Sequence, residues 1–329
     1  MARLRKTVPF CGLPFARLAG LAGSTAAAVV GVGSSHGSPN DGAENGPFFV
    51  RMLSKAYTWG AATPAVLDLS QGDVALHDVV DLGDVESGPA QPGATPLDQV
   101  LADVAAVVGA LPGGVVPAVI GGDHTVTLPV VAALAAARTE PFSVVQFDHH
   151  LDLQVWGDSD ASRERIFHTN VMSHVADRLG AGRLVQVGVN PYAVVEAASA
   201  GPVGDYVRSV GRQIPVFSSE LADVEAFRGV VGDGDVYVTV DVDVLNDAEM
   251  SSTGYPAEFG MTLHNLLGLI DALLASNRLV GFDVVEFAAG RDDRDRKTLA
   301  DAARASHIFL RLLGWASRQA AARRRQATA

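Results

Sequence analysis

The sequence contains almost no cysteine. Cys11 is the only one among 329 residues, so the fold cannot depend on an intrachain disulfide. A chain without disulfides suits a reducing compartment, and we therefore predict a cytoplasmic location. Basic residues are also scarce, because 25 Lys and Arg stand against 37 Asp and Glu and give a net charge of −12. This charge repels nucleic acids and anionic membrane surfaces, so neither is an expected partner.

Long apolar stretches are missing as well. Charged or turn-forming residues interrupt every apolar run before it reaches the ~20 residues of a membrane-spanning helix, so we expect no such helix. Residues 3–6 are partly basic and precede small and apolar residues, as in a secretory signal. However, Pro9, Pro14 and Arg17 break that stretch. We interpret residues 1–24 as an extension before the first strand.

The chain shows neither an internal repeat nor a linker rich in Pro and Ser. Hydrophobic residues make up 48% and charged residues 19% of the sequence, which is typical of a folded domain rather than a disordered chain or a coiled coil. A length of 329 residues fits one large domain. We predict an α/β domain over residues 25–316, followed by a basic tail at residues 317–329.

Short runs rich in Val and Ile alternate with longer segments rich in Ala and Leu. This alternation is typical of buried parallel strands that are covered by helices. The expected strands are residues 27–32, 74–82, 116–120, 143–147, 184–189, 214–217, 236–240 and 279–285. The expected helices are residues 97–111, 127–137, 169–179, 263–275 and 298–314. The pattern therefore predicts an α/β fold.

Acidic residues and histidines cluster where three of these strands end. The clusters are Asp123-His124, Asp148-His149-His150-Leu151-Asp152 and Asp241-Val242-Asp243. Ligands of open α/β sheets bind beyond the carboxyl ends of the strands, so these positions are candidates for a functional site. Each cluster alone has another explanation, because an Asp at a strand end often caps a helix and a lone His often packs in a core. Three clusters at three strand ends favour a shared site.

The residue types and their spacing indicate a metal site. Alternate residues of an extended chain project from one face, so the ligands of each cluster can share a pocket. Four carboxylates without a neighbouring Lys or Arg repel one another unless cations are present, and two divalent ions would balance their charge. Oxygen and imidazole ligands without thiolate favour Mn²⁺, with Fe²⁺, Co²⁺ or Zn²⁺ as substitutes. Two such ions that share a water lower its pKa, which implies hydrolysis. The candidate ligands are His124, Asp148, His150, Asp152, Asp241 and Asp243.

These motifs resemble those of the ureohydrolase family, which comprises arginases, agmatinases, guanidino-acid hydrolases and formimidoylglutamases. The resemblance runs from about residue 26 to residue 315. Gly-Gly-Asp-His at 121–124, Asp-x-His-x-Asp at 148–152 and Asp-x-Asp at 241–243 carry it. Weaker matches are Asn-Gly-Pro at 45–47 with Arg51, Asp-Leu-Gly-Asp at 81–84 and Asp-Val-Val-Glu at 283–286. The resemblance implies a three-layer α/β/α fold with a mostly parallel eight-stranded sheet, and a homo-oligomer that is a trimer or a hexamer.

The resemblance also implies a binuclear centre with two Mn²⁺ ions per subunit. One ion would be held by His124, Asp148, Asp152 and Asp241, and the other by Asp148, His150, Asp241 and Asp243. Asp148 and Asp241 would bridge the two ions. Asp152 would also hold and relay the proton of the attacking hydroxide.

Two further residues match catalytic positions of the family. His168 matches a histidine that shuttles protons and assists departure of the amine, which makes it a candidate general acid. Glu286 matches a glutamate that grips a planar guanidinium or amidinium cation, because a carboxylate accepts two N–H bonds in fork geometry. Either residue could instead be an ordinary loop or strand-end residue. The implied reaction cleaves a C–N bond of a linear guanidine or amidine and releases an amine plus urea, or formamide from a formimidoyl substrate.

Several residues depart from the family pattern where substrate would be selected. His149 stands where many relatives have Ala, Thr169 stands where Gly is frequent, and Asn246 lies where relatives commonly carry Asp-Pro. Residues 188–192 lack the acidic residue that is expected to bind the α-amino group of arginine. We therefore favour agmatine or a guanidino acid over arginine. The expected entrance residues are the loop 251–256, Gln154, Trp156 and Asn170.

Three alternatives stay open. A formimidoylglutamase-type hydrolase would release formamide instead of urea. A catalytically silent relative would keep the metal ligands without turnover. A nucleotide-binding protein would use the Gly-rich segment 31–37 after the first strand, although this segment lacks the GxGxxG spacing and no Gly-Lys-Ser/Thr phosphate loop follows it.

Overall fold

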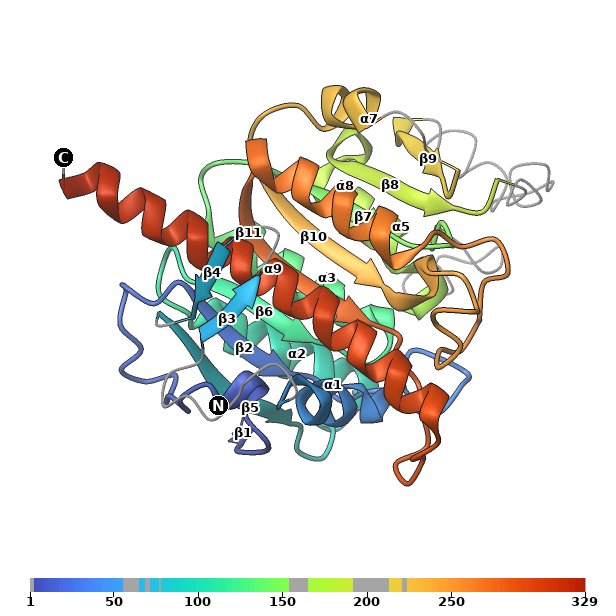
Figure 1. Cartoon of the computed structure of the whole chain (residues 1–329). Coiled ribbons are helices and arrows are strands. Elements are labelled where there is room, and N and C mark those ends of the chain that lie inside the picture. The colour runs from blue at the N-terminus through green and yellow to red at the C-terminus, as the bar shows by residue number, and fades with distance from the viewer. Residues whose placement is uncertain are drawn as a thin grey trace.

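The fold consists of one large sheet with helices on both sides (Figure 1). The structure is a computed structural model that describes residues 3–55, 65–68, 72–76, 78–153, 165–191, 213–220 and 224–328. None of the helices in these ranges is long and apolar enough to cross a membrane.

The large sheet is almost entirely parallel. Within the described ranges it has nine strands in the order β1-β5-β2-β6-β11-β10-β7-β8-β9, and β1 with β5 is its one antiparallel pair. Their bounds are β1 Arg3–Arg5, β2 Ala27–Gly31, β5 Val79–Glu86, β6 Val116–Ile120, β7 Phe142–Phe147, β8 Leu184–Val189, β9 Val216–Ser218, β10 Asp235–Asp241 and β11 Arg278–Val285. A separate antiparallel pair consists of β3 (Ala65–Asp68) and β4 (Gly72–Ala75). The strands β2, β6 and β8 are buried along their whole length, which explains their continuous apolar sequences.

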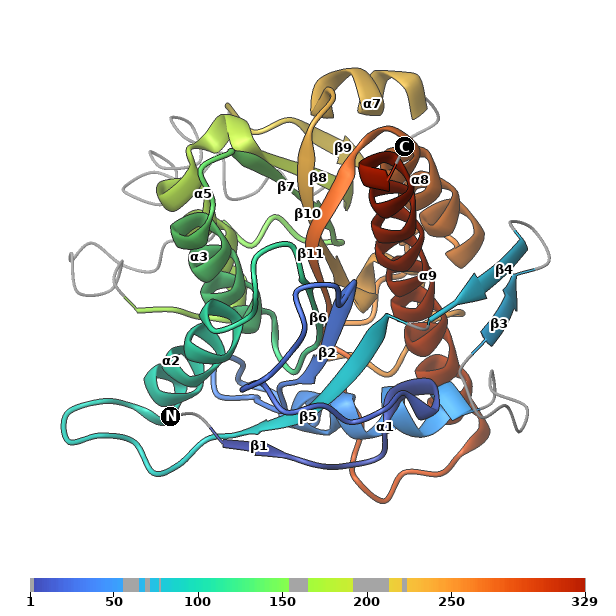
Figure 2. The ribbon, with the colours of Figure 1, turned by 90° about the vertical axis from the view of Figure 1, so that its left-hand side faces the viewer.

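Helices form a layer on each face of the sheet (Figure 2). One layer contains α2 (Pro96–Gly109), α3 (Thr127–Ala137) and α5 (Val171–Leu179). The other contains α1 (Gly46–Ser54), α7 (Val224–Val231), α8 (Leu263–Ser276) and α9 (Arg296–Thr328). Each layer packs against the sheet through its own apolar cluster. The expected fold class, a three-layer α/β/α arrangement with a mostly parallel sheet, is confirmed.

Two expected strand assignments need correction. The sheet has nine described strands rather than eight, because residues 3–5 of the predicted extension pair with β5 at its edge. The predicted strand 74–82 is divided, since β4 ends at Ala75 and β5 begins at Val79. Asp78 lies in the turn between them, and Asp is disfavoured in strands. The apolar residues on both sides of it made the run read as one strand.

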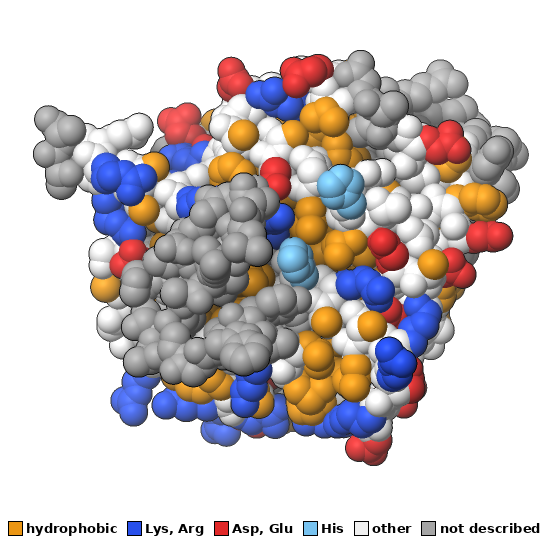
Figure 3. Space-filling model, viewed as in Figure 1, with side chains coloured by type: hydrophobic (Ala, Val, Ile, Leu, Met, Phe, Trp, Pro, Cys, Tyr) orange, Lys and Arg blue, Asp and Glu red, His pale blue; other side chains and the backbone are white. Residues whose placement is uncertain are grey.

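The predicted basic tail is helical. The helix α9 runs to Thr328, beyond its expected end at residue 314. Ala and Arg both have high helix propensity, so the Ala- and Arg-rich end continues the helix. Arg324 pairs with Asp78 and donates from Nη1 to Ser24 O at 2.9 Å, which ties this end to the rest of the fold. Figure 3 shows positive side chains gathered near it.

A buried arginine joins two of the weaker family motifs. Arg51 on α1 is fully buried and forms ion pairs with Asp81 and Asp84 of β5, the latter with Nε 3.0 Å from Oδ1. Its Nη2 also donates to Gly83 O at 3.2 Å. The carboxylate oxygen of Asp81 that pairs with Arg51, Oδ2, also accepts the backbone N–H of Phe10, which packs in the core. The arginine therefore fastens the N-terminal segment and α1 to the sheet.

The substitution Arg51→Ala should lower the free energy of unfolding by about 3 to 5 kcal/mol, because it leaves buried carboxylates without their counter-charge. Urea unfolding followed by circular dichroism measures this change. Arg228→Ala is the control, since Arg228 pairs with the exposed Glu225 and its loss should change the free energy by less than about 1 kcal/mol. Equal effects of the two substitutions would contradict this role of Arg51.

Candidate metal centre

The candidate residues follow four strands that lie side by side. The sheet order places β6, β11, β10 and β7 next to one another, and all are parallel. His124 follows β6, Glu286 follows β11, Asp241 ends β10 and Asp148 follows β7. Because the carboxyl ends of these strands meet at one edge of the sheet, the predicted clusters come together there.

His124 is the centre of the first group of ligands. Its Nδ1 lies 3.2 Å from Asp148 Oδ2, 3.0 Å from Asp152 Oδ2 and 3.4 Å from Asp241 Oδ2. All four side chains are buried. The other ring nitrogen, Nε2, lies 2.9 Å from Thr239 Oγ1. These four residues are the set predicted for the first metal ion.

His150 is the centre of the second group. Its Nδ1 lies 3.1 Å from Asp243 Oδ2 and 3.6 Å from Asp148 Oδ1. Asp148 therefore turns one carboxylate oxygen toward each group, which is the geometry of a bridging ligand. Asp241 turns Oδ2 toward His124, while its Oδ1 accepts a hydrogen bond from the backbone N–H of Asp243 at 2.9 Å.

The charges of the cluster call for a cation. Within the described residues, neither Lys nor Arg forms an ion pair with its four carboxylates. Burial and the neighbouring Asp243 and Asp148 raise the pKa of Asp241 well above its usual value, and burial and Asp148 raise the pKa of Asp243 to about 6. These raised pKa values mean that the charged forms of Asp241 and Asp243 are unfavourable at their buried positions. A divalent ion stabilises the charged forms without protonation.

The orientation of His124 provides a second test of whether a metal fits. If Nε2 donates its proton to Thr239, Nδ1 carries a lone pair that faces three carboxylate oxygens. Within the described residues, this buried Nδ1 has no hydrogen-bond partner. A lone pair among carboxylates is repulsive unless a cation lies between them. The ligand atoms of His124, Asp148 and Asp241 lie within 4.8 Å of one another, and so do those of Asp148, His150 and Asp243, so each group fits metal coordination.

Two buried glutamines that the sequence analysis missed support Asp148. Gln146 donates from Nε2 to Asp148 Oδ2 at 2.6 Å, and Gln186 on β8 donates from Nε2 to Gln146 Oε1 at 2.6 Å. Both side chains are fully buried. A polar residue inside an otherwise apolar strand was the available signal. The chain of amides orients the carboxylate that faces both groups of ligands.

A second buried network lies behind His124. Thr239 Oγ1 lies 3.3 Å from Thr127 Oγ1, which donates to Asp283 Oδ2 at 2.8 Å. Tyr237 donates its hydroxyl proton to the same oxygen of Asp283. Asp283 belongs to one of the weaker family motifs, so its position was visible in the sequence, but its partners were not. The network fixes the ring of His124 through Thr239.

Glu286 and His168 lie together beside the metal ligands. His168 Nδ1 is 3.3 Å from Glu286 Oε1, which also accepts the backbone N–H of His124 at 2.8 Å. Within the described residues, Oε2 has no hydrogen-bond partner, so one oxygen is anchored and the other is open. Burial alone would lower the pKa of His168, but the adjoining Glu286 raises it.

Backbone strain is concentrated at the same edge of the sheet. Asp152 and Glu286 have φ of 49° and 64°, in the left-handed region that few residues other than Gly adopt. Such a conformation costs of order 1 to 3 kcal/mol and persists where surrounding contacts impose it. Glu286 N donates to Gly122 O at 2.8 Å, and Asp152 O accepts the N–H of Met172 at 3.0 Å. These bonds hold both carboxylates in place.

The expected entrance is only partly in the described ranges. Tyr255 is 44% exposed and its ring stacks on His168 with a centroid separation of 5.8 Å. Asn170, in contrast, is buried, and its amide bonds the backbone of Phe167 and Arg165, so it holds a turn instead of lining an entrance. Gln154 and Trp156 lie outside the described residues.

Two departures from the family pattern have a structural explanation. His149 donates its backbone N–H to Asp243 Oδ1 at 3.3 Å, and its ring lies edge-on to His150 at 5.3 Å, so it does crowd the site. Burial and His150 lower the pKa of His149, which keeps its ring neutral. Asn246 donates from Nδ2 to Met261 O at 3.1 Å and accepts the N–H of Glu249 at 3.2 Å. These bonds define the loop after Asp243 without Asp-Pro.

The Gly-rich segment 31–37 serves the same site. Gly37 N donates to Asp123 Oδ2 at 2.9 Å, and Gly37 O accepts the N–H of His168 at 3.0 Å. A Cβ on Gly31 would collide with Asp84 Oδ1 at 1.9 Å. The glycines are therefore explained by close packing and by the positioning of His168, and the nucleotide-binding alternative loses its support.

Comparisons with known proteins find similar sequences over most of the chain. The arginase family model matches residues 25–310. Guanidinopropionase of Pseudomonas aeruginosa is 33% identical over 285 residues, 84% of this chain and 84% of that protein. Agmatinase of Edwardsiella ictaluri is 31% identical over 271 residues, 79% of this chain and 79% of that protein. The chain spans about half the length of some other curated relatives.

A solved structure supports the fold. Proclavaminate amidino hydrolase of Streptomyces clavuligerus matches with a TM-score of 0.72 at 24% identity, over 95% of this chain and 98% of that chain. At this identity the likeness concerns the arrangement of the strands and helices. It agrees with the three layers described above.

Removal and return of metal should change stability. After chelation and dialysis, Mn²⁺ at about 100 times its Kd should stabilise the protein by about 2.7 kcal/mol. Asp148→Asn should abolish most of this gain, because Asp148 faces both groups of ligands. Asp292→Asn, which changes an exposed carboxylate, should respond as the unmodified chain does. Thermal unfolding measures the shift, and an unmodified chain that ignores Mn²⁺ would refute the metal centre.

Proposed function

The chain belongs to the arginase family, whose members are hydrolases of C–N bonds in guanidino compounds, and we propose that it converts agmatine or a guanidino acid to an amine and urea. The observation that carries the proposal is the carboxylate of Glu286, whose Oε2 has no hydrogen-bond partner among the described residues, beside two groups of candidate metal ligands. The similarity to an agmatinase and a guanidinopropionase supports this substrate class.

We propose that two Mn²⁺ ions occupy the centre. His124, Asp148, Asp152 and Asp241 would hold one ion, and Asp148, His150, Asp241 and Asp243 the other. When bound, such a pair of ions supplies a water nucleophile at neutral pH. Asp152 would accept and relay a proton of that water. Its buried carboxylate is held close to His124, which supports this role.

Glu286 would bind the planar cation of the substrate. Its Oε1 is anchored by His124 N, which leaves Oε2 to accept an N–H of the guanidinium group. This contact would place the central carbon of the cation over the metal ligands. The negative charge of Glu286 would also favour a cationic guanidinium group over a neutral amide as the bound group.

His168 would donate a proton to the departing amine. Its Nδ1 adjoins Glu286, and the resulting rise in pKa favours the protonated ring that a general acid requires. Tyr255 stacks on the ring and restricts its orientation. His168 is outside both groups of metal ligands, so its role is separable from metal binding.

Two other functions remain as alternatives within the family. A formimidoyl substrate carries a similar planar cation and would yield formamide. A catalytically silent relative would bind metal without turnover. We also propose a homo-oligomer, trimeric or hexameric, and a cytoplasmic location, in which the buried thiol of Cys11 stays reduced. Light scattering of the purified protein determines the oligomeric state.

Product analysis tests the substrate class. The Mn²⁺-loaded protein is assayed with agmatine, 4-guanidinobutyrate, 3-guanidinopropionate, arginine and N-formimidoylglutamate, and urea and formamide are quantified separately. We expect urea from agmatine or a guanidino acid, with little turnover of arginine. Formamide as the product would move the protein to the formimidoyl alternative. Metal binding without either product would favour a silent relative.

The substitution His168→Asn should lower kcat by about 10² to 10⁴, the usual contribution of a general acid, and leave metal content unchanged. Steady-state kinetics and elemental analysis measure the two properties. His264→Asn on the exposed side of α8 is the control and should change neither. An unchanged kcat in His168→Asn, or a loss of metal that parallels the loss of activity, would contradict the assigned role.

A further inference from the structure

A cavity lies at the edge of the sheet opposite the candidate metal centre. It has a volume of about 310 Å³ and lies where β6 and β11 begin, between the C-terminal ends of α2 and α3. Eight residues of β11 separate its Arg278 from Glu286, which corresponds to about 26 Å along the strand. The cavity is therefore distinct from the candidate metal centre, and its volume falls in the range of small-molecule sites.

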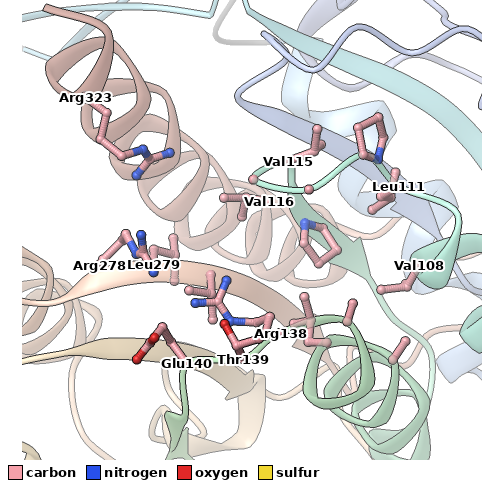
Figure 4. A pocket seen from close by; sticks show the side chains of 18 residues that line it. Val108, Leu111, Val115, Val116, Arg138, Thr139, Glu140, Arg278, Leu279 and Arg323 are labelled. Atoms are coloured by element: carbon pink, nitrogen blue, oxygen red, sulfur yellow. The ribbon is translucent and has the colours of Figure 1, made fainter. Parts of the chain in front are cut away.

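The cavity has one charged and one apolar side. In Figure 4, Arg138, Glu140, Arg278 and Arg323 are grouped on one side. Val108, Leu111 and Val115 form the other side in the same view. The two sides come from elements that are far apart in the sequence, since α9 supplies Arg323 and α2 supplies Val108. The cavity thus offers both a polar and an apolar wall to a ligand.

Two of the arginines share one carboxylate. Arg278 donates from Nε to Asp235 Oδ1 at 2.6 Å, and both Arg278 and Arg138 form an ion pair with Asp235 Oδ2. The single negative charge of Asp235 is therefore shared by the positive charges of Arg278 and Arg138. Within the described residues, the buried Nε of Arg138 has no hydrogen-bond partner. This wall therefore has more positive than negative charge, and it has an N–H donor, Arg138 Nε, that can still bind an acceptor.

Arg323 adds a third positive charge. It belongs to the basic end of α9, and within the described part of the chain it forms neither an ion pair nor a hydrogen bond. Burial and the cations of Arg278 and Arg324 lower its pKa, so its own charge is disfavoured by its surroundings. Glu140 is exposed at the same wall. Three arginines against Asp235 and Glu140 leave an excess of one positive charge.

We propose that this cavity binds a small organic anion, a carboxylate with an apolar body. Guanidinium groups recognise carboxylates through paired N–H donors, and Arg323 is available for such a contact. The apolar body would lie against Val108, Leu111 and Val115. Asp235 keeps Arg278 and Arg138 in place, so the wall is arranged before the ligand arrives. The proposal is independent of the substrate of the metal centre.

Calorimetry with hexanoate on the whole chain tests the proposal, with hexanol as the neutral probe of the same length. Hexanoate should bind at least about tenfold more tightly than hexanol, because a hydrogen bond to a charged group contributes about 1.5 kcal/mol or more. Arg323→Gln should weaken hexanoate binding about tenfold and leave hexanol binding unchanged. Glu140→Gln should strengthen hexanoate binding, since it removes a negative charge from the wall.

The matched control is Arg296→Gln, which removes the same charge from the other, exposed end of α9. It should leave hexanoate binding unchanged. Equal affinity for hexanoate and hexanol would overturn the proposal, because the cavity would then be merely apolar. Equal weakening by Arg323→Gln and Arg296→Gln would also overturn it, since net charge alone would explain the result.

Discussion

Four carboxylates lie buried at one edge of the sheet, and within the described ranges neither Lys nor Arg pairs with them. Burial and mutual repulsion raise the pKa of Asp241, Asp243 and Asp152, and His124 Nδ1 points into the same space. The folded chain therefore carries a cost that metal ions can remove. Binding of metal ions should therefore stabilise the folded chain, because the ions offset the repulsion between the buried carboxylates.

The fold makes this concentration of charge possible. Four adjacent parallel strands end at the same edge, and the hydrogen bonds behind them fix the ligands from the sheet side. The positive φ of Asp152 and Glu286 is an unfavourable backbone conformation, and hydrogen bonds to the surrounding backbone offset its free energy. On β5, which lies next to the edge strand β1, Arg51 pairs with Asp81 and Asp84. The chain therefore supplies a positive side chain to these buried carboxylates.

The sequence predicted the site better than it predicted the details around it. Apolar runs and the acids that follow them give strand ends directly, which is why His124, Asp148 and Asp241 were placed together. The split of residues 74–82 was missed because apolar residues lie on both sides of Asp78, so the pattern looked like one strand. The supports Gln146 and Thr239 were missed because their roles depend on contacts between strands, and the short-range pattern does not record such contacts. Asn170 looked like an entrance residue, yet its amide serves a local turn.

Anomalous diffraction from crystals grown with Mn²⁺, with data collected at the manganese absorption edge, tests whether these carboxylates hold two metal ions. We expect two peaks, one beside His124 Nδ1 among Asp148, Asp152 and Asp241, and one beside His150 Nδ1 and Asp243, with Asp148 between them. Absence of peaks at saturating Mn²⁺, or peaks at other residues, would contradict this expectation.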